Sequence, residues 1–280
     1  MALNTPGVSK AWAPDSTFFP AEDVLPDALY LLATTKGGEI QGDEPSLRVA
    51  YVDDADSADF VAEGAEIPLD DPTLDEVTLQ TRKISRLVKL SREQHGQPNT
   101  AEAVARSVAR DLTRKMDRAL LLQVAPTPPA VAPSTGLVNT AGLITGDPVT
   151  ADLDPLVDAV AEIQANLGNP KLLIVDPLAF AHLYKMRKGT GSNEGLLTPA
   201  TATPTSPVLG LQVVVNPLLT ANTALLVDPT AVVSAYSAVE VATSMDAFFT
   251  SDSVAMRATV RVGHVVVKPN RVALLTIGAA

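Results

Sequence analysis

The sequence has no cysteine and only three histidines in its 280 residues, and aromatic residues make up 4% of it. The absence of cysteine excludes disulfide bonds, thiolate metal sites and cysteine nucleophiles. His95, His182 and His264 have no spacing that matches a metal site, so we interpret them as structural residues.

Basic residues and long hydrophobic runs are also scarce. The chain carries 21 Lys and Arg against 32 Asp and Glu, a formal net charge of −11, which argues against nucleic-acid or anionic-membrane binding as the main function. The two uncharged stretches, residues 119–146 and 195–227, are interrupted by prolines, whereas a membrane span needs about 20 apolar residues in unbroken helix. The first 20 residues lack the features of a signal peptide, so we expect synthesis in the cytosol.

The sequence motifs of common enzymes and ligand sites are incomplete. The glycine-rich segment KGTGSNEG, residues 188–195, is followed by Leu196 where a phosphate loop needs its lysine and hydroxyl residue. The segment DADSAD, residues 54–59, has Asp59 where a calcium loop needs glycine. No serine lies in a nucleophile elbow. We therefore predict a protein that is not an enzyme, with no catalytic residue, no cofactor and no metal site.

Two neighbouring segments carry opposite charge. Residues 53–76 contain ten carboxylates and no basic residue, whereas residues 77–92 contain five basic residues and no acid. The acidic segment has few apolar residues, which indicates an extended loop or long hairpin with little core of its own. The apolar alternation changes phase near Thr81 to Lys83, so a bulge or bend is expected there.

Residues 99–123 show the strongest local pattern. Asn99 and Glu102 occupy capping-box positions, and the apolar period predicts a helix of about 24 residues, roughly 36 Å long. Its apolar residues recur every four positions, at Val104, Val108, Leu112, Met116 and Leu120. A row of arginines has the same spacing, at Arg106, Arg110, Arg114 and Arg118. Asp111 and Lys115 are available as an i, i+4 ion pair.

The remaining segments predict sheets. Residues 136–232 are typical of a compact α/β unit, with helices at 154–168, closed by Gly168, and at 177–188, and with strands at 171–176, 208–217 and 223–229. From Val239 onward, β-branched residues predict long antiparallel strands with a hairpin turn at Lys268 to Asn270. We expect these strands to pair with residues before 136, so that the α/β unit is an insertion.

The first 48 residues show no sustained period and predict an extended arm, with one strand at 47–52. Its apolar residues are expected to dock on a partner surface. They are Phe18, Phe19, Leu29, Tyr30, Leu31 and Leu32.

The order of these segments resembles the major capsid proteins of tailed bacteriophages, with the Hong Kong 97-type fold, across essentially the whole chain. The resemblance is carried by FVAEGAEIP (60–68), KISRLVKLSREQ (83–94), LIVDP (173–177) and LGLQVVVNPLL (209–219). It implies an α+β fold of four parts. These are an N-terminal arm (1–48), an extension loop formed by a β-hairpin (49–92), a peripheral domain with a long spine helix on antiparallel strands (93–135 and 233–280), and an inserted axial α/β domain (136–232).

The resemblance also implies a function. The chain would assemble with itself, as pentameric and hexameric capsomers, into the icosahedral head shell that encloses the double-stranded DNA of a tailed phage. It would be part of the virion after assembly in the host cytoplasm, without membrane or sequence-specific DNA contacts. A separate scaffolding protein, a portal and decoration proteins are further candidate partners. Some relatives cross-link a lysine of the extension loop, but no lysine occurs here between Lys36 and Lys83, so that chemistry is not expected.

In this family the extension loop lies over a neighbouring subunit, which gives the two charge blocks a role. We expect acids of the loop to meet basic residues of an adjacent subunit; the alternative is that both blocks are solvated faces. The candidate acids are Asp59, Glu63, Glu66, Asp70 and Asp71. The candidate basic residues are the helix row Arg106, Arg110, Arg114 and Arg118, and the strand residues Arg82, Lys83 and Arg86. Two other functions remain open, an encapsulin-like compartment shell and an uncharacterised α+β enzyme using residues 136–232.

Overall fold

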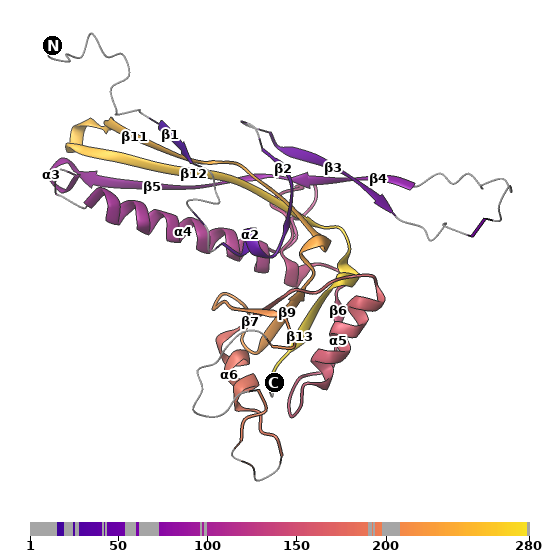
Figure 1. Cartoon of the computed structure of the whole chain (residues 1–280). Helices are drawn as coiled ribbons and strands as arrows, with labels where there is room; N and C mark the ends of the chain where they lie inside the picture. The colour runs from indigo at the N-terminus through magenta and orange to yellow at the C-terminus, as the bar shows by residue number, and fades with distance from the viewer. Residues whose placement is uncertain are drawn as a thin grey trace, which may run out of the picture.

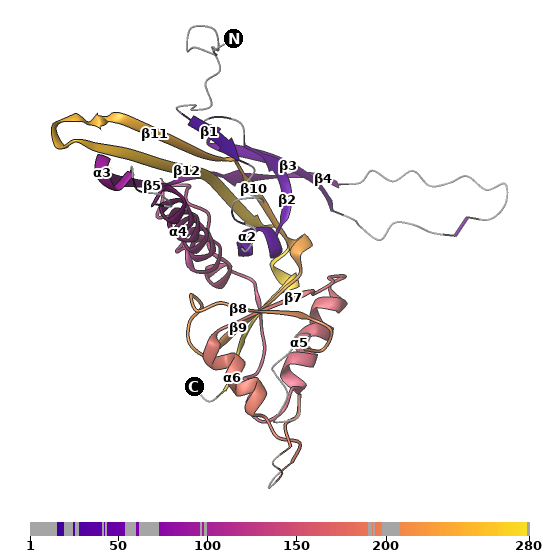
Figure 2. The ribbon, with the colours of Figure 1, turned by 60° about the vertical axis from the view of Figure 1, so that its left-hand side comes forward.

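The computed structural model is an α+β fold with two main β-sheets (Figures 1 and 2). The larger sheet carries a long helix on one face, and the smaller sheet, with two shorter helices, adjoins the end of that helix. The residues that the structure describes are 16–19, 25, 28–40, 42, 44–53, 60–61, 73–95, 97, 100–189, 192, 194–197 and 208–278.

Strand β12 (Ser253–Val266) is the centre of the six-stranded sheet. One edge of β12 pairs antiparallel with β5 (Arg82–Ser91). Its other edge pairs antiparallel with β11 (Val239–Phe248) and then with β10 (Val232–Tyr236). The expected pairing of the end of the chain with residues before 136 is therefore confirmed. The same pairing places β5, which we assigned to the extension loop, within this sheet.

The described part of the N-terminal arm belongs to the same body. Strand β1 (Ser16–Phe19) pairs antiparallel with β11, and β2 (Thr35–Glu39) runs parallel to β10. Between them, the short helix α2 (Leu29–Leu32) buries Leu29 and Tyr30 in the main hydrophobic core, each 1% exposed. The expectation that these two side chains dock on a partner is wrong, because the chain's own core buries them. The side chains of Phe18 and Phe19 lie outside the described residues.

Helix α4 (Thr100–Leu122) confirms the predicted long helix. Its inward residues pack in one core with Ala258, Val260 and Val262 of β12. They are Val108, Leu112, Met116 and Leu120, with Val104 packed against the edge of the core. The expected cap residue Asn99 and the side chain of Glu102 lie outside the described residues. A short helix, α3 (Arg92–His95), joins β5 to the segment before α4.

Strands β3 (Ser46–Asp53) and β4 (Thr73–Gln80) form a separate antiparallel pair that projects from the body (Figure 1). Between β4 and β5, Thr81 is buried; its backbone N–H donates to the Pro45 carbonyl (2.9 Å) and its hydroxyl to the Glu44 carbonyl (2.6 Å). These two bonds fix the backbone at Thr81, between the end of β4 and the start of β5. The predicted bend therefore lies at Thr81.

Gly263 of β12 lies directly beneath the end of β4. A Cβ atom at this position would lie 2.4 Å from the carbonyl oxygen of Gln80, closer than non-bonded atoms approach. Only glycine therefore lets β4 cross β12 at this distance.

The second sheet has the strand order β6-β13-β9-β7-β8. Its strands are β6 (Ile144–Thr145), β13 (Val272–Thr276), β9 (Thr223–Val227), β7 (Leu172–Val175) and β8 (Gln212–Val215). Helices α5 (Asp154–Ala165) and α6 (Pro177–Lys185) share a core with one face of this sheet, and the other face joins the core beneath α4. The helices and strands predicted for residues 136–232 are thus confirmed.

Two predictions for the last 13 residues of the chain, 268–280, are corrected. The turn at Lys268 to Asn270 does not form a hairpin, because the 3-10 turn η5 (Pro269–Arg271) leads the chain out of the first sheet and β13 pairs with β9 and β6. Strand β13 has side chains buried on both of its faces, as an interior strand of a covered sheet requires. Residues 272–276, which we assigned to the peripheral domain, therefore lie in the second sheet.

The end of α5 also differs in detail from the prediction. The residue in the left-handed conformation is Leu167 (φ 57°), not Gly168. Gly168 instead donates its N–H to the Ile163 carbonyl (2.9 Å), and a Cβ atom there would lie 2.6 Å from the Ile163 side chain. Gly168 is needed for close approach and not for a positive φ.

Candidate functional site

His264 is a buried structural residue, as predicted. The Tyr30 hydroxyl lies 2.6 Å from its Nδ1, and its Nε2 lies 2.7 Å from the Thr135 carbonyl oxygen. Because a carbonyl only accepts, Nε2 carries the proton and Nδ1 accepts from Tyr30. Burial lowers the pKa of His264 to about 4, and the bond to Thr135 opposes this shift. Burial also raises the pKa of Tyr30. Both groups are therefore neutral at pH 7.

Asp117 is a buried carboxylate that the sequence reasoning missed. Its Oδ1 accepts from the Leu29 backbone N–H (2.8 Å), and its Oδ2 accepts from Nδ2 of Asn216 (3.2 Å). Burial raises its pKa to about 6, while the bonds from Leu29 and Asn216 lower it. Asp117 thus links α4, α2 and the segment after β8. The available signal was its position directly after Met116, beside the apolar row of the helix.

The described residues contain no cluster of His, Asp and Glu side chains that could hold a metal ion. Within the same described residues, no helix is both long and apolar enough to cross a membrane.

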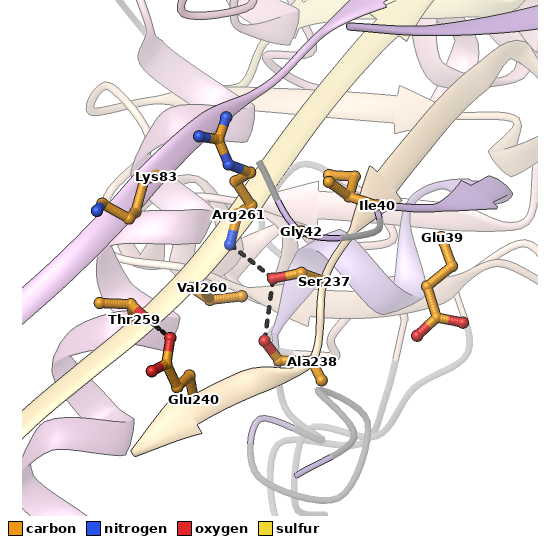
Figure 3. Close-up of a pocket in the computed structure, with 10 residues that line it drawn as sticks. All are labelled: Glu39, Ile40, Gly42, Lys83, Ser237, Ala238, Glu240, Thr259, Val260 and Arg261. Carbon is orange, nitrogen blue, oxygen red and sulfur yellow. Dashed lines mark hydrogen bonds between the residues drawn. The ribbon is translucent and has the colours of Figure 1, made fainter. Parts of the chain in front are cut away.

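The face of the larger sheet opposite α4 carries a hollow of about 630 Å³ (Figure 3). It lies at the link between β10 and β11, where the Ser237 hydroxyl accepts from the Arg261 N–H (2.9 Å) and donates to the Ala238 carbonyl (2.9 Å). Thr259 donates to a Glu240 oxygen at 3.3 Å. Glu39 and Glu240 oppose Lys83 and Arg261, so the described lining has no dominant charge.

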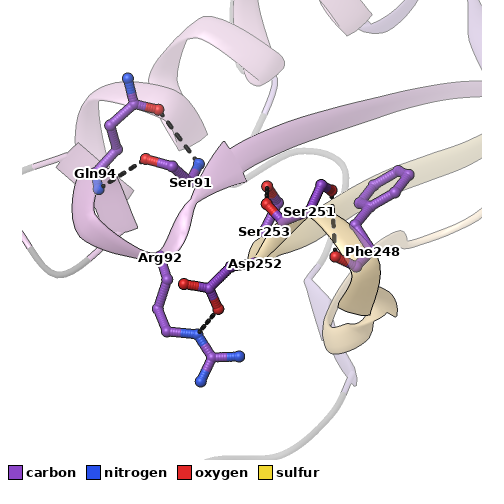
Figure 4. Close-up of polar contacts among 7 residues, drawn as sticks. All are labelled: Ser91, Arg92, Gln94, Phe248, Ser251, Asp252 and Ser253. Atoms are coloured by element: carbon purple, nitrogen blue, oxygen red, sulfur yellow. Dashed lines mark hydrogen bonds and ion pairs between the residues drawn. The ribbon is translucent and has the colours of Figure 1, made fainter.

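The far end of the larger sheet is fastened by polar contacts (Figure 4). Arg92, at the start of α3, forms an ion pair with Asp252 (2.8 Å), and its N–H donates to the Asp252 carbonyl (3.1 Å). Ser91 and Gln94 exchange two hydrogen bonds that cap α3. Phe249, in the 3-10 turn η4 (Phe249–Ser251) between β11 and β12, is 80% exposed. This end is a hydrogen-bonded corner with an apolar side chain on its surface.

The predicted basic residues fall into two groups. Arg86 is held within its own chain, by an ion pair with Asp111 and a bond from Nη1 to the Ser107 carbonyl (3.3 Å). We had expected Asp111 to pair with Lys115. It pairs with Arg86 instead. The exposed predicted residues are Arg82, Lys83, Arg106, Arg110, Arg114 and Arg118.

The predicted acids Asp59, Glu63, Glu66, Asp70 and Asp71 lie outside the described residues, so their contacts with basic residues stay a prediction.

Comparison with known proteins places this architecture. A model of the phage capsid family matches residues 33–277. A structure from Microbacterium phage Oxtober96 has a TM-score of 0.67 at 16% identity and covers 99% of each chain. One from Mycobacterium phage Bobi has a TM-score of 0.64 at 16% identity over 100% of each chain. The capsid of an empty GTA particle has a TM-score of 0.65 at 16% identity, over 99% of this chain and 100% of that chain.

At such identities the structural likeness shows the fold alone, and no curated protein matches the sequence. The family model, however, spans most of the chain, so it covers the long helix and, apart from β1, both sheets. The chain belongs to the phage capsid family.

Proposed function

We propose that this chain is the major capsid protein of a tailed phage, which assembles from pentamers and hexamers into an icosahedral shell around double-stranded DNA. The observation that carries the proposal is the family match over residues 33–277. The whole-chain superposition on capsid structures supports it, including a capsid described with C5 symmetry.

The parts of the fold take family roles in this proposal. The six-stranded sheet with α4 as its spine helix forms the peripheral domain, and the second sheet with α5 and α6 forms the axial domain. The β3–β4 pair is the base of the extension loop. Its support is the topology, in which β3 and β4 form a sheet separate from the other two.

The projecting hairpin favours a contact between subunits. Leu79 at its base is fully buried and Leu47 packs beside it, whereas Glu76 and Arg48, further along, are exposed. A two-stranded sheet is marginal by itself in water. We infer that a neighbouring subunit covers the hairpin and that its acids meet basic residues there.

The other partners follow from the same role. The shell would enclose DNA without dense phosphate contacts, in keeping with the net charge of −11. A scaffolding protein, a portal and decoration proteins would act during or after assembly in the host cytoplasm. The loop at residues 188–207 would face the centre of each capsomer.

Electron microscopy and sedimentation of the purified protein test the proposal. Closed shells of megadalton mass with five- and six-membered capsomers are expected. A homogeneous small oligomer that forms no shell across a range of protein and salt concentrations would refute it. Nuclease-protected DNA in particles recovered from infected cells distinguishes a phage head from a compartment that encloses proteins.

A further inference from the structure

A second hollow, of about 310 Å³, lies between the start of β5, the outer side of α4 and residues 132–134. Arg82 of β5 and Lys115 of α4 line it. The side chain of Lys83, the next residue of β5, lies on the opposite face of the sheet, in the first hollow. The described lining contains no carboxylate. The hollow therefore brings together two positive charges, one from each element, and we call it the cationic pocket.

Lys115 does not form the ion pair that its spacing on α4 allows, because the partner at that spacing, Asp111, pairs with another residue. Asp111, one turn earlier on α4, forms its ion pair with Arg86 of β5. Among the described residues, Lys115 has no hydrogen bond, ion pair or ring contact. The tertiary contact of β5 with α4 thus leaves one cation of the helix unmatched.

The basic residues of residues 82–92 also fall into two groups, those with a partner and those without one among the described residues. Arg92 pairs with Asp252, and the ammonium of Lys89 lies 4.9 Å from the ring centre of Phe248. Arg82 and Lys83 have no such partner in the part of the chain that the structure describes. Of these two cations of β5, Arg82 faces the cationic pocket.

The floor of the pocket does not neutralise them. Tyr30 and His264 are neutral and bonded to each other (2.6 Å). The Ser134 hydroxyl accepts from the backbone N–H of His264 (3.1 Å) and donates to the backbone carbonyl of Gln80 (3.1 Å). These polar groups are already used within the fold, so no described residue of the lining supplies a counter-charge.

The hairpin that flanks the acidic segment extends away from this pocket. Strand β4 has eight residues, so Thr73 lies roughly 23 Å along the strand from Gln80, at about 3.3 Å per residue. The hairpin points away from α4 (Figure 1). Asp53 and Thr73 lie at the far end of the hairpin, and the sequence segment between them carries seven of the ten carboxylates of residues 53–76.

We propose that the cationic pocket of one subunit receives carboxylate side chains from residues 53–76 of a second copy of the chain. This rests on the proposed function, because it requires that copies assemble side by side. The proposal identifies the receiving surface. The charge pattern of the sequence had left two candidates for it, β5 and the arginine row of α4.

Concavity favours the pocket over the arginine row. Arg110, Arg114 and Arg118 are exposed on a convex helix face, where ion pairs are screened and contribute about 0.2 to 1 kcal/mol each. In a hollow partly lined by Ile84, Ala119 and Val262, less water separates the charges and each attraction is stronger. Duplex DNA is the less suitable occupant, since the whole chain carries a net charge of −11.

The first test is binding to the unassembled subunit. A synthetic peptide of residues 53–76 is titrated onto the wild type, onto Arg82→Glu/Lys115→Glu, and onto the control Arg110→Glu/Arg114→Glu. Both double variants change the net charge equally at exposed positions. We expect salt-sensitive peptide binding that the pocket variant weakens at least about tenfold and the control changes less than about twofold. Equal weakening in both variants would overturn the proposal.

The second test is assembly, followed by sedimentation, with circular dichroism and thermal unfolding to verify that each variant folds. The pocket variant should lose shells while the control keeps them, and raised salt should partly restore the pocket variant. Normal shells from the pocket variant would contradict the inference but leave the proposed function intact. If the wild type forms no shells, the proposed function fails, and peptide binding still reports on the pocket.

A third measurement addresses the competing occupant. A short DNA duplex is titrated onto the same three proteins at physiological salt. Negligible binding to the wild type supports the assignment to carboxylates. Binding that the pocket variant abolishes and the control retains would instead identify a phosphate site and overturn the proposal.

Discussion

Asp117 accepts a hydrogen bond from Asn216 across the junction of the two sheets, at 3.2 Å from Nδ2 to Oδ2. Asn216 is fixed in turn, because its Oδ1 accepts from the Leu218 N–H (2.9 Å). The other oxygen of Asp117 accepts from the first residue of α2, whose flanking residue Ala28 provides no side-chain cap. A single carboxylate therefore ties the long helix to the N-terminal segment and to the second sheet.

Removing the amide should destabilise the subunit. Asn216→Ala leaves one buried oxygen of Asp117 without its donor, which typically costs about 1 to 3 kcal/mol. Chemical denaturation of the unassembled subunit measures the loss. Asn270→Ala is the control, since Asn270 is exposed and bonds to the half-buried Asn166 (3.1 Å), and it should change the free energy of unfolding by less than about 0.5 kcal/mol. Equal effects of the two substitutions would contradict the role of Asn216.

Acidification should act on His264. Its folded pKa of about 4 lies below the ordinary 6.5, so between these values the unfolded state binds more protons and stability falls as the pH falls. Relative to His264→Gln, the wild type should lose on the order of 2 to 3 kcal/mol between pH 7 and pH 4, at 1.36 kcal/mol per pKa unit. Denaturation curves over this range measure the difference, and parallel pH profiles would argue against a buried neutral imidazole.

Asp117 should act in the opposite direction. Its folded pKa of about 6 lies above the ordinary 3.8, so its contribution to stability is complete below pH 3.8 and is lost as the pH rises through 6. Relative to Asp117→Asn, the wild type should gain on the order of 2 to 3 kcal/mol as the pH falls from 7 to 4. The same denaturation series tests this. A wild type that loses stability relative to Asp117→Asn over this range would show that burial does not dominate.

Leu112→Asp should prevent folding. Leu112 is 2% exposed in the core between α4 and β12, and an aspartate there would place an unpaired charge among apolar side chains at a cost of several kcal/mol. Soluble expression and circular dichroism provide the measurement. Arg118→Asp changes an exposed position of the same helix and should leave the fold intact, whereas a soluble, normally folded Leu112→Asp protein would refute the packing of α4.

Gly263→Ala should displace the base of the hairpin. The added methyl group would meet the backbone of Gln80 at 2.4 Å and a Leu79 methyl at 2.6 Å, so β4 has to move away from β12. We expect a loss of about 1 to 3 kcal/mol in unfolding free energy, as for overpacked sites, and faster amide exchange in β4. Gly189→Ala is the control, since nothing lies within 4 Å of its added Cβ. Unchanged exchange in Gly263→Ala would refute the close crossing.

The sequence by itself determined the elements whose pattern is local. The four-residue period of Val104 to Leu120 predicts α4, because one helix face repeats at that spacing whatever it packs against. The phase change near Thr81 predicts the bend between β4 and β5 for a similar reason, since side chains alternate along a strand. The helices and strands of residues 136–232 have their own boundary residues, such as Asp176 and Pro177 at the start of α6.

The tertiary structure decided which elements and charges meet. The sequence of strand β13 has the same apolar, β-branched character as β12, the strand before it in the chain. Only its pairing with β9 places it in the second sheet, because the sequence of an apolar strand does not specify its partner. Asp111 had a helical partner in Lys115 by spacing, yet β5 brings Arg86 to it. Through that one exchange the fold leaves Lys115 beside Arg82, because charges far apart in sequence are neighbours only after the chain has packed.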